Sequence, residues 1–195
     1  MFASDRELQA PLAASDGSGQ LQVARPWDGV LRRPEGRDAL DMHRLVVESK
    51  VLDENSTYAY LLMATEFADS SIVADRDGEL HGFVMGYHPP SRPEALFVWQ
   101  VVVAAAARGS GLGGTMLDTL VERVRRDRHG HPLTLEATVA PSNSASRALF
   151  GGFARRHGVP VVELPWYGAE LLDADLAHEE EPLLRIGPVT AELNC

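Results

Sequence analysis

The sequence has very little cysteine, since its 195 residues include only Cys195, at the last position. A single cysteine cannot form a disulfide within the chain. The disulfide frameworks that stabilise many small secreted domains are therefore excluded. A reducing compartment is the simplest setting for such a chain, and we expect a cytoplasmic protein.

Long apolar runs are also missing. No stretch approaches the ~18 to 20 apolar residues that a membrane-spanning helix needs. The N-terminal sequence MFASDRELQAPLAASDGSGQ has no basic segment followed by an apolar core, so no secretory signal peptide is predicted. The net charge of -10 at pH 7 disfavours nucleic acid and anionic membranes. We expect neither among its partners.

The remaining composition is that of one globular domain. Hydrophobic residues make up 45% of the chain and charged residues 24%, which is ordinary for a folded protein long enough to bury a core. Residues 1–22 are polar and rich in Ala, Ser and Gly, so we expect disorder there. We predict a single domain over residues 23–189 and a flexible tail over residues 190–195.

The most informative segment runs from Leu96 to Gly114 as LFVWQVVVAAAARGSGLGG. Its apolar residues through Val103 predict a buried strand, and an amphipathic helix should follow the glycine-rich turn and run to about Arg126. Strand, glycine turn and helix together suit a phosphate ligand, because the first N–H groups of a helix lack partners and glycine allows close approach. Arg108 would add a fixed positive charge.

Two kinds of nucleotide site use such a turn. Gly109, Gly111 and Gly114 fit the G-x-G-x-x-G fingerprint of dinucleotide binding, with Glu136 near the acidic position ~20 residues further on. That fold, however, places its glycines directly after the strand, whereas four alanines and Arg108 intervene here. Read as R-x-x-G-x-G, the turn resembles motif A of the GNAT N-acetyltransferases, which binds the pyrophosphate of acetyl-CoA. A plain glycine turn is the third possibility.

The order of the predicted elements favours the acetyltransferase. Asp38 and Ser56 are candidate caps of two successive helices, and Asp77-Gly78 is a strong two-residue hairpin signal. The expected order is strand, two helices, three strands, helix, strand, helix and two strands, and these include strands at 29–33, 133–140, 161–166 and 183–187 and a helix at 143–156. The predicted fold class is α/β (α+β), a GNAT N-acetyltransferase fold with a mixed, mostly antiparallel central sheet flanked by helices.

Several longer segments narrow the resemblance. Over roughly residues 28–188 the chain resembles the L-2,4-diaminobutyrate acetyltransferases of ectoine biosynthesis, through LDENSTYAYLL, TEFADSSIVA, GFVMGYHPP, LFVWQVVV, LEATVAPSNSASRALF and LLRIGP. The resemblance implies acetyl transfer from acetyl-CoA to the γ-amine of L-2,4-diaminobutyrate, giving N4-acetyl-L-2,4-diaminobutyrate for cyclisation to ectoine. It also implies a cytoplasmic homodimer. Two departures are Ala105, where the family often has proline, and HEEEP at 178–182, which matches loosely.

The GNAT resemblance also implies the acetyl-CoA contacts. Backbone N–H groups of the central strand would hold the oxyanion and pair with the pantetheine arm, and N-x-x-S-x-x-L-F from Asn143 is a second signature. Asn143 is also a natural helix N-cap. The expected cofactor-binding residues are Val101, Val102, Val103, Arg108, Gly109, Ser110, Gly111, Leu112, Gly113, Gly114, Asn143, Ser146 and Phe150.

Amide formation requires a neutral amine, whereas a lysine-like amine has a pKa of ~10.4. The site must therefore remove a proton or disfavour the charged form by desolvation. Glu136 is the candidate base, directly or through water, and a carboxylate paired on the solvent face is the alternative. Many GNAT enzymes protonate the leaving thiolate with a tyrosine at the position of Phe150. Tyr58 or Tyr167 would replace it, or the thiolate leaves unassisted.

Diaminobutyrate carries one carboxylate and two amines, so its recognition needs unlike groups. Asp53 and Glu181 are the candidates for the ammonium groups. Trp99 and Tyr58 are candidate pocket walls, with core packing as the alternative for Trp99. Asn55 and Glu136 complete the predicted substrate set.

Two other functions stay open. Phe150 is compatible with an acetyl-CoA-binding module that has lost catalysis, and pocket detail could favour another small amine or a protein N-terminus. The complete phosphate loop, Asn143 and Asp53 favour an enzyme. His178 and Glu181 lie three residues apart, but without a second His or Cys nearby no metal is expected.

Overall fold

The computed structural model describes residues 27–50, 52, 54–172 and 179–190. Within them the chain order is β1 (Val30–Arg32), α1 (Ala39–Ser49), α2 (Thr57–Thr65), β2 (Ile72–Arg76), β3 (Glu79–Tyr87), β4 (Ala95–Val103), α3 (Leu112–Asp127), β5 (Leu133–Thr138), α4 (Ser144–His157), β6 (Val161–Tyr167), α5 (Ala169–Leu172) and β7 (Glu181–Val189). Short 3-10 helices occur at η1 (Gly36–Asp38), η2 (Ala68–Ser70) and η3 (Ala105–Ala107). The predicted order is confirmed, and the short α5 is an addition to it.

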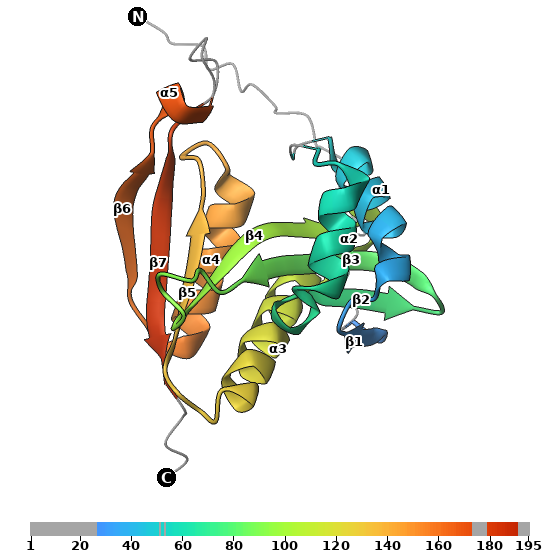
Figure 1. The fold of residues 1–195 in the computed structure, drawn as a ribbon, viewed down its shortest axis with the longest axis horizontal. Helices are drawn as coiled ribbons and strands as arrows, with labels where there is room; N and C mark the ends of the chain where they lie inside the picture. Colours follow the sequence, from blue (N-terminus) through green and yellow to red (C-terminus); the bar gives the residue numbers. More distant parts are fainter. Residues whose placement is uncertain (1–26, 51, 53, 173–178, 191–195) are drawn as a thin grey trace, which may run out of the picture.

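One seven-stranded sheet organises the fold, with the strand order β1-β2-β3-β4-β5-β7-β6 (Figure 1). Every neighbouring pair is antiparallel except β4 and β5, which run parallel. The sheet is therefore mixed and mostly antiparallel, as predicted for the GNAT fold.

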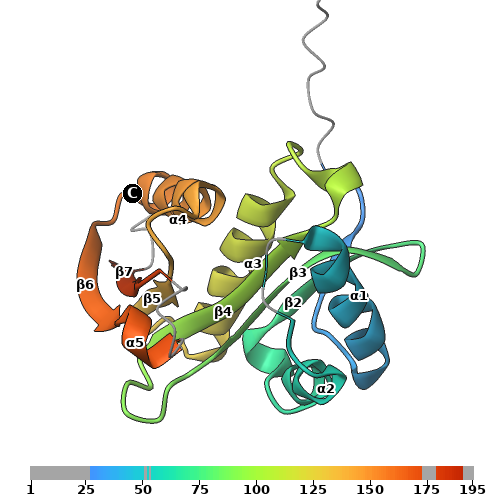
Figure 2. The same ribbon diagram turned by 90° about the horizontal axis from the view of Figure 1, so that it is seen from above.

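Helices cover the two faces of this sheet. Figures 1 and 2 show α1 and α2 on one face, over β2 to β4, and α3 and α4 on the other. Apolar residues of α3 recur at helical spacing and pack with α4 and the sheet into one core cluster, through Met116, Leu117, Leu120, Val121 and Val124. A second cluster joins α1 and α2 to the other face of β2, β3 and β4.

Several local predictions are confirmed in detail. Asp77 and Gly78 have φ values of 55° and 83°, the left-handed pair that a tight hairpin turn requires, and Asp75 Oδ1 accepts a hydrogen bond from the Gly78 N–H at 2.9 Å. Ser56 caps α2 by accepting from the Ala59 N–H, and Asn143 caps α4 by accepting from the Ser146 N–H.

The predicted cap at Asp38 is wrong in its chemistry. Asp38 occupies the N-cap position of α1 but makes no side-chain cap hydrogen bond there. Its buried carboxylate instead accepts from the Arg32 guanidinium at 2.7 and 2.9 Å and from the Glu35 N–H at 2.7 Å. A charged partner on β1 outcompetes the helix N–H groups for this carboxylate.

Predictions about the chain ends stay predictions. Residues 1–22, where we expected disorder, lie outside the described residues, as do residues 191–195 of the tail predicted over residues 190–195. In the part of the chain that the structure describes, no helix is both long and apolar enough to cross a membrane.

Candidate active site

A cleft opens where β4 and β5 separate. The two strands are paired only from Ala95–Thr134 to Phe97–Glu136, and β4 then runs away from β5 (Figure 1). A cavity of about 650 Å³ occupies this opening. Its described lining consists of Leu52, Asn55, Leu62, Met63, Phe67, Tyr87, Phe97, Val98, Trp99, Gln100, Val101, Ala137, Thr138, Val139, Ala140, Asn143, Ser146, Phe150, Tyr167, Leu172 and Glu181.

A register break in β4 shapes one wall of the cleft. Gly86 pairs with Val98 and Met85 with Gln100, so Trp99 has no partner on β3 within the described ladder. A Cβ on Gly86 would lie 2.6 Å from the Phe97 carbonyl oxygen, so only glycine fits here without a shift. The extra residue places the Trp99 side chain on the cavity wall, where it is 42% exposed. The edge of β4 beyond Phe97 has no described β5 partner, so its backbone groups are available to an extended ligand.

The predicted phosphate loop lies between β4 and α3. Gly109 and Gly111 have φ values of 77° and 81°, and a Cβ on either would meet nothing within 4 Å. Packing therefore leaves open space beside both glycines, and Gly111 is the N-cap of α3, whose first N–H groups can bind an anion. Arg108 is exposed at the mouth of the loop, and its Nε donates to the Val103 carbonyl at 3.2 Å. These residues fit a pyrophosphate.

The start of α4 faces the same cleft. Asn143, Ser146 and Phe150 line the cavity, and Phe150 is buried. Asn143 Oδ1 is engaged by the Ser146 N–H at 3.0 Å. Of the three predicted strand residues Val101, Val102 and Val103, Val101 belongs to the described lining, whereas the Val102 side chain is buried on the α1–α2 side.

Glu136 is held by two arginines. Its side chain is 1% exposed, and it accepts from Arg92 Nε at 3.1 Å and from Arg185 Nε at 2.9 Å. Both carboxylate oxygens are therefore occupied, and Glu136 is outside the described lining of the cavity. This geometry argues against direct removal of the amine proton by Glu136, although its role as a base stays a prediction.

The two predicted tyrosine acids have different positions. Tyr58 is 70% exposed and is not part of the described cavity lining. Tyr167, at the end of β6, does line the cavity. Tyr87 lines it too, at the end of β3, and was not identified from the sequence because no local motif distinguishes a strand-end tyrosine that faces a ligand from one that packs.

The predicted substrate residues largely come together. Asn55, from the segment before α2, Trp99 of β4 and Glu181 of β7 all line the cavity, whereas Glu136 does not belong to its described lining. Glu181 Oε2 accepts from the Thr138 hydroxyl at 2.7 Å. Asp53 lies outside the described residues, so its predicted contact with an ammonium group stays a prediction.

Polar residues that sequence reasoning missed include Gln100 and Thr138. Gln100 Oε1 accepts from the buried Tyr60 hydroxyl at 3.4 Å, and that hydroxyl accepts from the Asn55 N–H at 3.4 Å. This connects the segment before α2 to β4 across the cavity wall. In the described part of the chain no group of three His, Cys, Asp or Glu residues could hold a metal ion, and His178 lies outside that part.

Comparisons with known proteins agree with this geometry. The sequence profile of the acetyltransferase (GNAT) family matches residues 39–153. The chain is 38% identical to an L-2,4-diaminobutyric acid acetyltransferase from Nocardia farcinica, over 96% of this chain and 91% of that protein. It is 43% identical to the protein of the same name from Bordetella parapertussis, over 90% of this chain and 95% of that protein.

A solved structure is also similar over most of its length. It is the diaminobutyrate acetyltransferase EctA from Paenibacillus lautus in complex with L-2,4-diaminobutyric acid and coenzyme A. The TM-score is 0.76 and the identity 38%, over 86% of this chain and 99% of that one. The predicted resemblance is thereby confirmed, and the chain belongs to the acetyltransferase (GNAT) family, within the group of L-2,4-diaminobutyric acid acetyltransferases.

Proposed function

We propose that this protein transfers the acetyl group of acetyl-CoA to the γ-amine of L-2,4-diaminobutyrate, giving N4-acetyl-L-2,4-diaminobutyrate for ectoine biosynthesis. The single observation that carries the proposal is the cleft between β4 and β5. It joins an open strand edge, the N-terminus of α4 and the carboxylate of Glu181 in one cavity. The named relatives and the Paenibacillus lautus complex support the choice of substrate.

Each part of the cleft has a function in this proposal. The loop from Arg108 to Gly114 holds the pyrophosphate of acetyl-CoA, since glycines with positive φ leave room beside helix N–H groups. The open edge of β4 near Val101 pairs with pantetheine and holds the carbonyl oxygen that becomes negative. Apolar side chains around this edge exclude water, which favours the neutral form of the amine.

Opposite charge orients the acceptor. Glu181 is the one carboxylate on the described lining, so it is placed to hold an ammonium group. Asp53 is proposed for the second ammonium group, and Asn55 and Trp99 for the walls. Tyr167 is the proposed acid for the leaving thiolate in place of the usual tyrosine at Phe150, because Tyr167 lines the cavity and Tyr58 does not.

The test measures acetyl transfer by the purified protein to a panel of amines. The CoA thiol released in each turnover is the readout. We expect diaminobutyrate to give the highest kcat/KM, with ornithine, lysine and a peptide N-terminus at least tenfold lower, since one methylene alone is worth ~10–200-fold in a fitted site. Equal rates for all amines would favour the alternative of a general amine acetyltransferase. Acetyl-CoA binding without turnover of any amine would favour a binding module that has lost catalysis.

A cytoplasmic homodimer is part of the proposal. Its support is the outer strand β6 with α5, which exposes Val161, Val162, Trp166, Tyr167 and Leu171 at the edge of the sheet. A row of exposed apolar residues on an edge strand suits pairing with a second copy. Light scattering after size exclusion should give about twice the chain mass of 21.2 kDa. Val162→Glu should shift the protein toward the monomer, and a parent that is monomeric at every concentration would contradict the dimer.

A further inference from the structure

A buried carboxylate with two guanidinium partners lies at the closed end of the cleft. Glu136 on β5 accepts from Arg92, in the β3–β4 connection, and from Arg185 on β7, with the shortest distances at 3.1 and 2.8 Å. Its strand partner Phe97 and the next residue Ala137 both line the cavity. Two guanidinium groups and one carboxylate leave a net positive charge just behind this end of the cavity.

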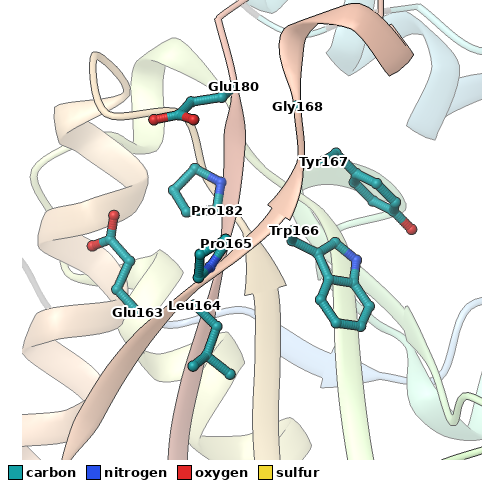
Figure 3. A pocket seen from close by; sticks show the side chains of 8 residues that line it. All are labelled: Glu163, Leu164, Pro165, Trp166, Tyr167, Gly168, Glu180 and Pro182. Carbon is teal, nitrogen blue, oxygen red and sulfur yellow. The ribbon is translucent and has the colours of Figure 1, made fainter.

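Arg92 is the arginine of this group that packs on an aromatic side chain of β6. Its Cζ lies 5.1 Å from the centre of the Trp166 ring, and the next residue, Tyr167, lines the cavity. Figure 3 shows Trp166 and Tyr167 pointing to one side of β6 and Glu163 and Glu180 to the other. Glu163 pairs with Arg147 of α4, so the two aromatic residues are on the face away from α4.

Tyr87 shares this end of the cavity with Tyr167. Its ring packs against Phe67 and Phe97, with centroid distances of 6.2 and 5.3 Å. Burial raises the pKa of the Tyr87 hydroxyl, the neighbouring Tyr167 and Glu136 raise it further, and Arg92 opposes the shift. Tyr87 therefore stays protonated and can donate a hydrogen bond, with the charge of Arg92 close by.

The substrate class requires a group of this kind. An amino acid brings a carboxylate into the cleft, and the described lining offers the carboxylate of Glu181 but no Lys, Arg or His. A carboxylate taken from water without donors or a nearby cation is strongly disfavoured. Arg92 lies behind the described lining, on Glu136 and over the Trp166 ring, and is placed to supply this positive charge.

We infer that Arg92 determines specificity for an amino acid: with the Tyr87 hydroxyl it holds the α-carboxylate of the acceptor. Glu136 and Trp166 keep Arg92 in place. Binding the carboxylate at the closed end leaves the far end of the acceptor directed along the cleft, toward the open edge of β4. The cleft then has a positive end at Arg92 and a negative group at Glu181. This inference rests on the proposed function, because it assumes an amino acid as the acetyl acceptor.

The experiment compares two inhibitors that each lack one group of diaminobutyrate. L-2-aminobutyrate keeps the carboxylate and the α-amine, whereas 1,3-diaminopropane keeps both amines and lacks the carboxylate. Inhibition constants against diaminobutyrate are measured for the parent, for Arg92→Gln, and for the matched control Arg185→Gln. Both variants remove one guanidinium from the same Glu136 carboxylate, and each leaves the other arginine paired with it.

We expect Arg92→Gln to raise the KM for diaminobutyrate and the inhibition constant of L-2-aminobutyrate about tenfold, in line with loss of a charge-assisted contact. The inhibition constant of 1,3-diaminopropane should change less than about twofold, because it has no carboxylate to lose. Arg185→Gln should leave the ratio of the two inhibition constants unchanged. Tyr87→Phe, which keeps the packed ring and all ion pairs, should shift the ratio in the same direction as Arg92→Gln.

Equal weakening of both inhibitors in Arg92→Gln would overturn the inference, as would an equal change of the ratio in Arg185→Gln. If Arg92→Gln does not fold by circular dichroism, Tyr87→Phe decides, and an unchanged ratio there overturns the inference. Turnover of diaminobutyrate by the parent is measured first. Its absence would refute the proposed function, whereas turnover by the parent with an unchanged ratio of the two inhibition constants in Arg92→Gln would refute the inference alone.

Discussion

Replacing Glu136 by glutamine keeps the size of the side chain and removes its charge from a position that is 1% exposed. The two arginines that it holds would then share one neutral acceptor. Breaking a buried ion pair costs roughly 3–5 kcal/mol. Arg92 and Arg185 are 25% and 39% exposed, so water replaces part of the lost interaction. We therefore expect a loss of about 2–3 kcal/mol in the free energy of unfolding.

For a protein of this size, each kcal/mol shifts Tm by roughly 2–4 °C, so Glu136→Gln should lower Tm by about 4–12 °C. The matched control is Glu163→Gln, which removes a half-exposed carboxylate that Arg147 also contacts twice. Its Tm should stay close to that of the parent, because exposed ion pairs contribute little.

The assay combines scanning calorimetry with steady-state kinetics below the transition. If Glu136 holds Arg92, Glu136→Gln should have a lower Tm and a higher KM for diaminobutyrate than the parent. Its kcat should stay within about tenfold of the parent value. Removing a general base costs typically 10²–10⁴-fold in kcat. An unchanged Tm together with a kcat at least about a hundredfold lower would contradict a structural role for Glu136 and identify it as the base.

Three further changes address other parts of the molecule. Arg108→Ala should weaken acetyl-CoA binding about ten- to a hundredfold by titration calorimetry, since a charged hydrogen bond is worth roughly 1.5–3 kcal/mol; unchanged affinity would contradict the phosphate loop. Tyr167→Phe should lower kcat with little effect on KM if Tyr167 is the acid, and full kcat would indicate unassisted thiolate departure. Burial raises the pKa of the Asp38 carboxyl, but hydrogen bonds from Arg32 and the Glu35 N–H lower it, and the net shift is downward. The ionised Asp38 carboxylate therefore stabilises the fold above pH ~4, and this stabilisation is lost as the pH falls through the folded pKa. Urea unfolding should find Asp38→Asn less stable than the parent at pH ~7, with a smaller difference at pH ~3, and a constant difference would contradict this.

Features that depend on neighbouring residues could be predicted from the sequence. Asp77-Gly78 predicts its hairpin because two consecutive residues must take positive φ. Ser56 and Asn143 predict helix starts because their side chains reach an N–H three residues on. The glycine loop before α3 predicts a phosphate site for the same local reason, and the family resemblance supplied the fold around it.

Features that depend on distant partners could not be predicted. Glu136 meets Arg92 and Arg185 across 44 and 49 residues, so the sequence left its role open between a base and a paired carboxylate. The Asp38 carboxylate pairs with Arg32 and does not cap the start of α1. The position of Tyr87 on the cavity wall follows from the packing of β3 against β4 and has no local signal. Charge pairing and strand separation are therefore what the structure adds to the sequence.

The position of the acetyl group in the product decides whether the γ-amine is the acceptor. Diaminobutyrate is incubated with the protein and acetyl-CoA that carries 13C in the acetyl carbonyl. A two-dimensional NMR spectrum then correlates this carbonyl carbon with the protons on the carbon that bears the amide nitrogen. We expect the labelled carbonyl to correlate with the two protons of the γ-methylene group. A correlation with the single α-proton, or no labelled amide at all, would contradict it.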